Sequence, residues 1–211
     1  MTGGDDGSWS ARLQAVNWNA LPPPEDDGGA DHLVGMALPD FSLPASDGTS
    51  VNLAELPGVA VIYAYPMTAT PGVALPAGWD MIPGARGCTP QACSFRDHAA
   101  ELAELGVRHL FGVSTQSTAA QAEAVYRLHL PFRLLSDDAL HLADALRLPV
   151  MEVEGRAMLR RLTLIASDGI MRAALYPVFP PDTAPAAVRG WLEQASQHRA
   201  SLHLHHRQPQ R

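Results

Sequence analysis

The stretch Val59-Ala60-Val61-Ile62-Tyr63-Ala64-Tyr65 decides the fold class of this chain. It is almost wholly apolar and rich in β-branched and aromatic residues, and short runs of this kind are typical of central strands buried on both faces. Pro66 ends the run. We therefore predict a central β-strand here and place the other elements around it.

Two β-hairpins are predicted, one upstream and one downstream of this strand. In each, two short runs flank an Asp-Gly turn, which is a strong hairpin signal. The runs are Phe41–Ala45 with Ser50–Leu53, and Arg161–Ala166 with Ile170–Leu175.

Strand and helix patterns alternate through the rest of the chain. Helices are expected at Gln91–Leu105, Thr118–His129, Asp138–Leu146 and Ala184–Gln197, and strands at His109–Ser114 and Phe132–Leu135. This order implies an α/β fold with a mixed central sheet, helices on both faces and an N-terminal hairpin. A thioredoxin-like fold is compatible with the pattern, and so are other three-layer folds.

Residues 36–197 are predicted to form the domain, and residues 1–35 an extension before it. Within the extension, apolar residues recur at spacings of four and three from Trp9 through Leu13 to Val16, which indicates a short helix. The stretch 22–29 is rich in proline, glycine and acidic residues and indicates a linker. The short helix either packs on the domain, which we favour, or serves as a partner-binding arm.

Residues 198–211 are predicted to be a tail. They contain His203, His205 and His206 together with several arginines. We expect a disordered tail, and the alternative is a weak metal site, because clustered imidazoles bind transition metals.

The composition excludes several classes of protein. The chain has 211 residues and a net charge of -7, whereas a nucleic-acid footprint needs clustered cationic side chains. No run approaches the roughly 18 apolar residues of a membrane span, and the acidic N-terminus lacks the apolar segment of a signal peptide. We expect a cytoplasmic protein that binds neither nucleic acid nor membrane.

Lysine is absent, since all 15 basic residues are arginine. Schiff-base chemistry needs a lysine amine, and the phosphate-binding P-loop needs a Gly-Lys pair. The motifs Gly-x-Ser-x-Gly and His-Glu-x-x-His are absent as well. Several large classes of enzyme are therefore excluded.

The two cysteines of the chain, Cys88 and Cys93, are the first candidates for chemistry. In a reducing compartment such a pair is more often catalytic or metal-binding than a structural disulfide. Two thiolates cannot complete a four-ligand zinc site, and no histidine spacing near them supplies the other ligands. Redox chemistry is therefore favoured.

Cys88 is predicted to lie where a loop becomes a helix. Glycines precede it, Pro90 suits a first helical turn, and apolar periodicity begins directly afterwards. Free N–H groups and the positive end of the helix dipole favour an anion such as a thiolate at this position. Arg86 and Arg96 add positive charge, so Cys88 is the better candidate for a nucleophile.

Cys93 lies five residues further along the same predicted helix. In a regular helix the two Cα atoms would be about 8–9 Å apart, beyond the roughly 7 Å limit of an unstrained disulfide. A disulfide between Cys88 and Cys93 therefore requires the first helical turn to unwind. The plain alternative is that a cysteine serves as a small core hydrophobe, which suits Cys93 better than Cys88, whose loop context is not core-like.

The ten residues Cys88-Thr89-Pro90-Gln91-Ala92-Cys93-Ser94-Phe95-Arg96-Asp97 strongly resemble the active-site helix of peroxiredoxins of the bacterioferritin-comigratory-protein type. The likeness extends over most of residues 36–196, with weaker support from Leu38–Phe41, Tyr63–Pro66 and Gly112–Ser114. The resemblance implies a thioredoxin-like fold.

The resemblance also implies a role for each matching residue. Cys88 would be the peroxidatic cysteine, which reacts with a hydroperoxide to give a sulfenic acid, and Cys93 the resolving cysteine, which condenses with it to a disulfide. Arg161 matches the arginine that polarises peroxide and thiolate; Arg160 is the alternative, and for either the plain reading is a surface arginine. A thioredoxin-like or glutaredoxin-like donor would reduce the disulfide. No cofactor or metal is implied, and a monomer or homodimer is expected.

An insertion interrupts the family pattern Pro-x-x-x-Thr-x-x-Cys. Pro66 and Thr70 begin the pattern, but Val73 occupies the cysteine position, and the cysteine follows only after residues 73–87. The departure puts the position of Thr70 in doubt.

Two accounts of the insertion are possible. In the one we favour, it loops out, Pro66 and Thr70 stay in the site, and Trp79 covers the pocket. In the other, Thr70 loses its role to Thr89 or to backbone N–H groups. We also hypothesise that the insertion widens the pocket for bulkier hydroperoxides.

Two other functions compete with a peroxidase. The first is a thiol-disulfide reductase or redox sensor on the same fold, although the Cys-x-x-Cys of thioredoxin-type reductases is absent. The second is a redox-inactive interaction protein that uses the Trp9 helix or the His-rich tail. Fast oxidation by H2O2 would exclude the first, and loss of biological activity in Cys88→Ser would exclude the second.

Overall fold

A five-stranded mixed sheet forms the centre of the molecule. The computed structural model describes residues 16–205, with side chains as far as His198. The order of the strands is β5-β4-β3-β8-β9. They are β3 (Val59–Ala64), β4 (Val107–Ser114), β5 (Leu134–Ser136), β8 (Leu162–Ser167) and β9 (Ile170–Leu175).

β3 is the middle strand because its side chains are apolar on both faces. Five of its six residues are buried. It runs parallel to β4 and antiparallel to β8, so that Val61 lies opposite both Leu110 and Ile165. The prediction of a mixed sheet built around this strand is confirmed.

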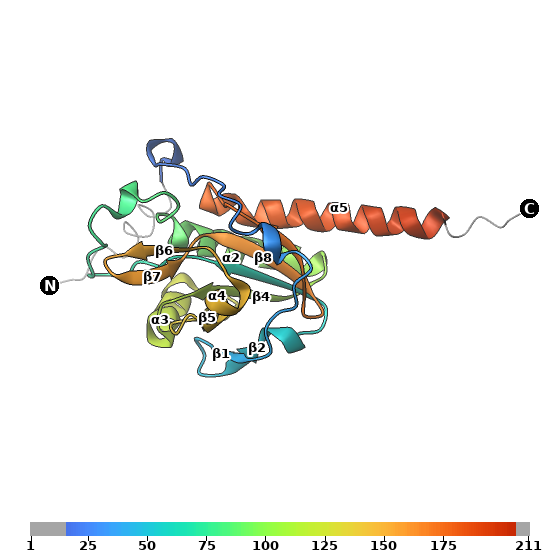
Figure 1. The fold of residues 1–211 in the computed structure, drawn as a ribbon, viewed down its shortest axis with the longest axis horizontal. Helices are drawn as coiled ribbons and strands as arrows, with labels where there is room; N and C mark the ends of the chain where they lie inside the picture. Colours follow the sequence, from blue (N-terminus) through green and yellow to red (C-terminus); the bar gives the residue numbers. More distant parts are fainter. Residues whose placement is uncertain (1–15, 206–211) are drawn as a thin grey trace, which may run out of the picture.

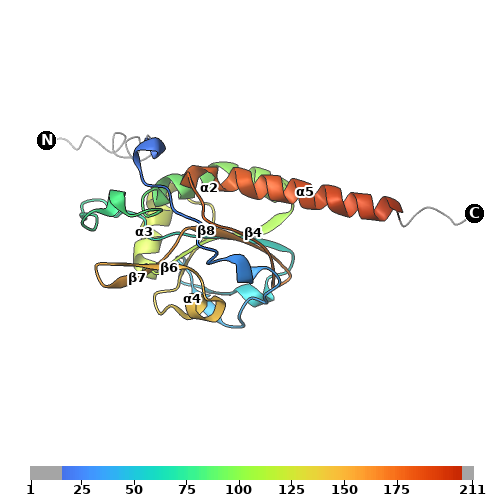
Figure 2. The same cartoon turned by 45° about the horizontal axis from the view of Figure 1, so that its top comes forward.

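Helices cover both faces of the sheet (Figures 1 and 2). On one face, α2 (Cys88–Glu104), α3 (Thr118–Leu128) and α5 (Ala184–His205) share an apolar cluster with β3. On the other face lie α4 (His141–Leu146) and the antiparallel hairpin of β1 (Ser42–Pro44) and β2 (Ser50–Asn52). The predicted layers and the N-terminal hairpin are therefore confirmed.

The second predicted hairpin joins β8 to β9 through Asp168 and Gly169. Both residues have positive φ, 51° and 74°, as a tight hairpin turn requires. The Asp168 carboxylate also accepts a hydrogen bond of 2.7 Å from the Gly58 N–H, which ties the turn to the residue before β3. This hydrogen bond is the main reason that the pKa of Asp168 is lowered.

A third hairpin has no counterpart among the predicted elements. β6 (Val150–Val153) and β7 (Arg156–Leu159) pair antiparallel around Glu154 and Gly155, whose φ angles are 50° and 74°. Glu-Gly is a weaker turn signal than Asn-Gly or Asp-Gly, and three of the four residues of β6 are not buried. The sequence pattern therefore gives little sign of this element.

The segment before residue 36 is more closely packed than an extension. Ala30 and Leu33 are buried in the apolar cluster that contains the residues of α4. The predicted boundary at residue 36 therefore lies too late in the chain. The stretch from Leu21 to Gly29 forms neither helix nor strand, as expected for the linker, and a short 3₁₀ turn, Trp18–Ala20, precedes it. The predicted helix from Trp9 to Val16 lies outside the described residues, apart from Val16.

α5 continues beyond the predicted end of the domain. It reaches His205, so the prediction of a disordered tail is wrong for residues 198–205. Between Gly190 and Pro209 the sequence contains no glycine or proline, and alanine, leucine and arginine are good helix formers. The far half of α5 projects away from the domain in both ribbon views (Figures 1 and 2). Residues 206–211 and the side chains of the three clustered histidines lie outside the described part.

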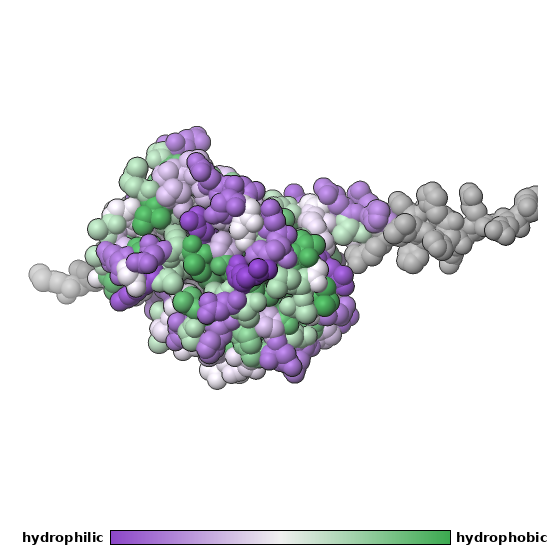
Figure 3. Space-filling model, viewed as in Figure 1, coloured by the Kyte–Doolittle hydropathy of each residue, from purple (hydrophilic) through white to green (hydrophobic). Residues whose placement is uncertain are grey.

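The surface shown in Figure 3 is mixed, with hydrophobic residues scattered between hydrophilic ones. Among the described residues, no helix combines the length and the apolar character needed to cross a membrane.

Candidate active site

Cys88 is the first residue of α2, at the junction of loop and helix that the sequence predicts. Gly87 precedes it with a φ of 107°, a backbone conformation that favours glycine. Pro90 lies in the first turn, where its missing N–H costs no helical hydrogen bond. The helix therefore begins at Cys88 rather than at the predicted Gln91.

Three groups contact the sulfur of Cys88. Nη2 of Arg161 donates to Sγ across 3.3 Å, and the backbone N–H of Met67 donates across 3.4 Å. As a thiol, Cys88 donates in turn to the carbonyl of Ala85 across 3.6 Å. Two donors, one of them cationic, are thus placed to stabilise negative charge on the sulfur.

Cys88 is buried, with only 3% of its surface exposed. It belongs to the apolar cluster of Tyr63, Tyr65 and Phe95, so the expectation that its context is not core-like is wrong. The reason is that the first turn of α2 packs onto the sheet as closely as the later turns do. Burial raises the pKa of Tyr63 and of Tyr65, so that both rings are neutral phenols at physiological pH.

Arg161 is held in place by neutral groups. It is 3% exposed, and its Nη1 donates to Oε1 of Gln91. Its Nη2 also lies 3.2 Å from three backbone carbonyls, those of Gly84, Ala85 and Arg86. Among the described residues, no carboxylate forms an ion pair with Arg161. In the described part of the chain, the sulfur of Cys88 is therefore the hydrogen-bond partner of this guanidinium that can carry negative charge.

Arg160, the alternative to Arg161, points elsewhere. Its Nε donates to the carbonyl of Val150 across 3.0 Å, and its Nη1 lies 4.0 Å from the carboxylate of Asp27. Consecutive residues in an extended segment point to opposite sides. The structure therefore brings Arg161, and not Arg160, to the cysteine.

Cys93 lies in the second turn of α2 and is also buried. Both cysteines are free, and both belong to the same apolar cluster. Because α2 is helical from Cys88 onward, the two Cα atoms keep the helical separation of about 8–9 Å, too far for a disulfide. Nearby, the pKa of Arg96 is raised, mainly by its hydrogen bond to Asp97.

The insertion loops out from the domain, with residues 71–74, 77 and 78 exposed, and returns to the site at Trp79. Its 3₁₀ turn, Trp79–Met81, places the Trp79 ring in a small apolar cluster with Val153 and Met158 of the third hairpin. Trp79 also lines a cavity of about 30 Å³ that contains Cys88. An ion pair of 2.5 Å between Arg86 and Asp80 joins this 3₁₀ turn to the end of the insertion. Trp79 therefore lies beside the cysteine, as the favoured account expects.

Pro66 and Thr70 do not line the cavity at Cys88. They line a larger one of about 560 Å³, together with Thr115 and Met158. Thr89, in the first turn of α2, lines the cavity of the cysteine. Roles for Pro66 and Thr70 in the chemistry stay predictions.

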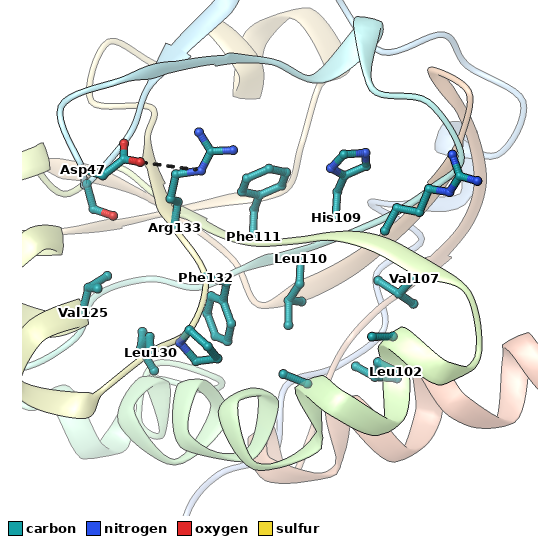
Figure 4. Close-up of a pocket in the computed structure, with 15 residues that line it drawn as sticks. Asp47, Leu102, Val107, His109, Leu110, Phe111, Val125, Leu130, Phe132 and Arg133 are labelled. Carbon is teal, nitrogen blue, oxygen red and sulfur yellow. Dashed lines mark ion pairs between the residues drawn. The ribbon is translucent and has the colours of Figure 1, made fainter.

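Another groove, of about 520 Å³, lies beside the outer edge of β4 (Figure 4). Leu110 points from β4 toward Leu102 of α2, while Phe111 and Arg133 point to the other side of the strand. Neither cysteine lines this groove. Among the described residues, no group of three or more His, Cys, Asp or Glu side chains is arranged to hold a metal ion.

Two contributors to the site are missing from the sequence-based prediction. Gln91 follows Cys88 by three helical positions and so lies on the same face of α2, a spacing that could have identified it. Met67 contributes a backbone N–H, for which its side chain gives no signal. The same holds for the loop carbonyls around Arg161, because every residue has one.

A mixed sheet with helices on both faces, a cysteine pair in the first two turns of a helix and an arginine at the first sulfur together define a thioredoxin-like fold with a candidate redox site. The Redoxin family model matches residues 33–189. The chain belongs to the Redoxin family, and the resemblance noted in the sequence is confirmed.

The relatives of this chain are peroxiredoxins. It is 29% identical over 149 residues to peroxiredoxin Q, chloroplastic, from Oryza sativa, a match covering 70% of this chain and 61% of the relative. A putative peroxiredoxin bcp of Coxiella burnetii is 38% identical over 105 residues, 49% of this chain and 59% of the relative. The chain thus spans about three fifths of the length of these curated relatives. The crystal structure of peroxidoxin BcpB from Mycobacterium tuberculosis superposes with a TM-score of 0.61 at 27% identity, covering 76% of this chain and 96% of that one.

Proposed function

We propose that this protein is a thiol-dependent peroxidase that reduces hydrogen peroxide or organic hydroperoxides with Cys88 and then forms an internal disulfide with Cys93. One observation carries the proposal: the buried guanidinium of Arg161 lies 3.3 Å from the Cys88 sulfur and pairs with no carboxylate in the described part of the chain. A buried cation without a counter-charge is costly. A Cys88 thiolate supplies that charge.

The first step is attack of the sulfur on the peroxide. The Cys88 thiolate forms a bond to one peroxide oxygen, the O–O bond breaks, and Cys88 becomes a sulfenic acid. The other oxygen leaves as hydroxide or alkoxide and takes up a proton to give water or an alcohol. Arg161 and the N–H of Met67 stabilise the negative charge as it moves from the sulfur to the leaving oxygen.

Two spare donors are available to orient the peroxide. Nε of Arg161 and Nε2 of Gln91 are buried and have no hydrogen-bond partner among the described residues. Buried donors are rarely left unpaired in folded proteins. We assign them to the oxygens of the bound peroxide, because both belong to residues that meet at Cys88.

The second step is condensation of the two sulfurs. Cys93 attacks the sulfenic sulfur, the S–O bond breaks, water leaves, and a disulfide forms. The first turn of α2 unwinds to allow this step. A dithiol protein of the thioredoxin or glutaredoxin type then restores both thiols by exchange. We also propose that the protein works in the cytoplasm, as a monomer or homodimer.

Mass spectrometry of peroxide-treated protein tests the proposal. We expect a Cys88–Cys93 disulfide in the wild type, a sulfenic or further oxidised Cys88 in Cys93→Ser, and no oxidation of Cys93 in Cys88→Ser. Stopped-flow oxidation by H2O2 should show a reaction far faster than that of an ordinary thiol. An ordinary thiol rate in the wild type would contradict a peroxidase and favour a redox sensor.

A further inference from the structure

Trp18, in the segment before the domain, packs against the start of the active-site helix. A Cβ atom added to Gly87 would lie 2.8 Å from Cη2 of Trp18 and 2.6 Å from Cγ of Pro181. Both side chains therefore touch the backbone of the residue that directly precedes Cys88. The glycine is needed here for its positive φ and also for this close approach.

Further contacts fix Trp18 in this position. Its Nε1 donates to the carboxylate of Asp182 across 3.3 Å, and its ring meets Phe179 edge to face, with 6.1 Å between centroids. The carbonyl of Asp182 accepts a hydrogen bond of 2.7 Å from Oγ of Ser94, in the second turn of α2. Trp18 and the segment 179–182 thus contact the helix at Gly87, before its first turn, and at Ser94, in its second turn.

The first turn of α2 is held by burial and by a hydrogen bond as well as by these contacts. Its residues from Cys88 to Gln91 are all buried, and its first helical hydrogen bond runs from the Gln91 N–H to the carbonyl of Gly87, 3.0 Å away. Unwinding breaks this bond and moves Gly87, against which the Trp18 ring lies. A Cys88–Cys93 disulfide therefore requires Trp18 to move as well.

We infer that Trp18 is a positioning residue, which holds the first turn of α2 helical. It thereby sets the lifetime of the Cys88 sulfenic acid before Cys93 reacts with it. The inference rests on the proposed function. While the turn holds, a second peroxide can transfer an oxygen to the sulfenic sulfur, which leaves a sulfinic acid and water or an alcohol. When the turn opens, the disulfide forms instead. Trp18 thus sets the ratio of these two products.

Single-turnover oxidation tests this role. After one equivalent of H2O2, disulfide formation in Trp18→Ala should be roughly tenfold faster than in the wild type. This corresponds to a free-energy barrier to unwinding that is about 1.4 kcal/mol lower. With excess peroxide, the same variant should yield less sulfinic acid. Trp18→Phe retains an aromatic ring at Gly87 and should lie close to the wild type. Tyr126→Ala is the control, because it removes an aromatic residue that is 84% exposed on α3.

Hydrogen exchange on the reduced protein tests the same contact without any peroxide. In Trp18→Ala the Gln91 amide should exchange faster relative to amides in the middle of β3, whereas Tyr126→Ala should leave it unchanged. An unchanged Gln91 amide together with a disulfide rate within twofold of the wild type would overturn the inference. Should the wild type form no disulfide at all, the proposed function fails, and the exchange measurement alone decides on Trp18. If Trp18→Ala does not fold, Trp18→Leu replaces it, because it also removes the aromatic ring from Gly87, and the same direction is expected on a smaller scale.

Discussion

The guanidinium of Arg161 and the sulfur of Cys88 lie 3.3 Å apart, although 73 residues separate them in the sequence. The sheet explains this proximity. β3 and β8 are antiparallel neighbours, with Ala64 at the end of β3 opposite Leu162 at the start of β8. The loop that leads from β3 to Cys88 therefore begins beside the residue that directly follows Arg161.

Replacement of Arg161 should slow the reaction with peroxide far more than replacement of its neighbour. For Arg161→Met we expect a loss of roughly 100- to 1000-fold in the rate of Cys88 oxidation, the range typical of removing one donor that stabilises developing charge. Arg160→Met is the matched control, since Arg160 contacts Val150 and Asp27 instead of the cysteine. Stopped-flow measurement of both variants with H2O2 decides the matter. Equal losses would show that Arg161 has no special role.

The residue patterns predicted the layers of the fold, because the layers follow from which faces of each helix and strand are apolar. The run from Val59 to Tyr65 is apolar on both faces and became the middle strand, and the Asp168-Gly169 turn formed where the sequence indicates. The hairpin around Glu154 and Gly155 was missed, because its turn residues are weak signals and most of β6 stays exposed.

Part of the candidate site could likewise be predicted from the sequence, and part could not. The position of Cys88 at a helix start follows from local signals, namely the preceding glycine and Pro90. The choice of Arg161 over Arg160 depended on the resemblance, and the structure supplies its physical reason in the opposite directions of the two side chains. The path of the insertion depends on packing against β6 and β7, which no local pattern specifies.

Gln91 should support the reaction through Arg161. Its side chain is fully buried, and Oε1 accepts from Nη1 of Arg161. Gln91→Leu leaves that donor unpaired, so we expect a loss of about 1–3 kcal/mol in the free energy of unfolding and a fall of roughly tenfold or more in the rate of Cys88 oxidation. Gln121→Leu is a matched control, because Gln121 on α3 is equally buried but binds Ser114 of β4 and Leu135 of β5. It should lose stability and keep the rate; a parallel loss of rate in both variants would contradict a specific role for Gln91.

Gly112 should tolerate no side chain. A Cβ at this position would lie 2.6 Å from Leu134 and 2.7 Å from the ring of Tyr63, which is itself stacked on Phe95 with 4.5 Å between centroids. We expect Gly112→Ala to lower the free energy of unfolding by about 1–3 kcal/mol, as overpacking does. Gly190→Ala on α5 has open space around it and should instead raise stability by up to about 1 kcal/mol, the difference in helix propensity. Urea unfolding of both variants measures the two effects, and a neutral Gly112→Ala would contradict the tight packing.

The insertion should favour bulky hydroperoxides, because its apolar side chains line cavities near the active site. Two cavities of about 340 and 560 Å³ lie along it, and both are lined by Met67, Val73 and Met158. The smaller of the two also shares Met67 and Leu75 with the cavity that contains Cys88, so the two cavities are neighbours.

A charged side chain at one of these cavity-lining positions should slow the reaction of large hydroperoxides and leave that of small ones unchanged. Val73 is 65% exposed, so Val73→Asp should fold, yet we expect its kcat/KM for cumene hydroperoxide to fall by roughly tenfold, the effect of a poorly matched apolar contact. Turnover of H2O2, which is too small to reach Val73 from the sulfur, should be unchanged. Met81→Asp is the matched control, because Met81 is 69% exposed on the same insertion and lines none of the three cavities. Equal losses for both peroxides, or the same selective loss in Met81→Asp, would mean that the cavities along the insertion do not bind the alkyl group.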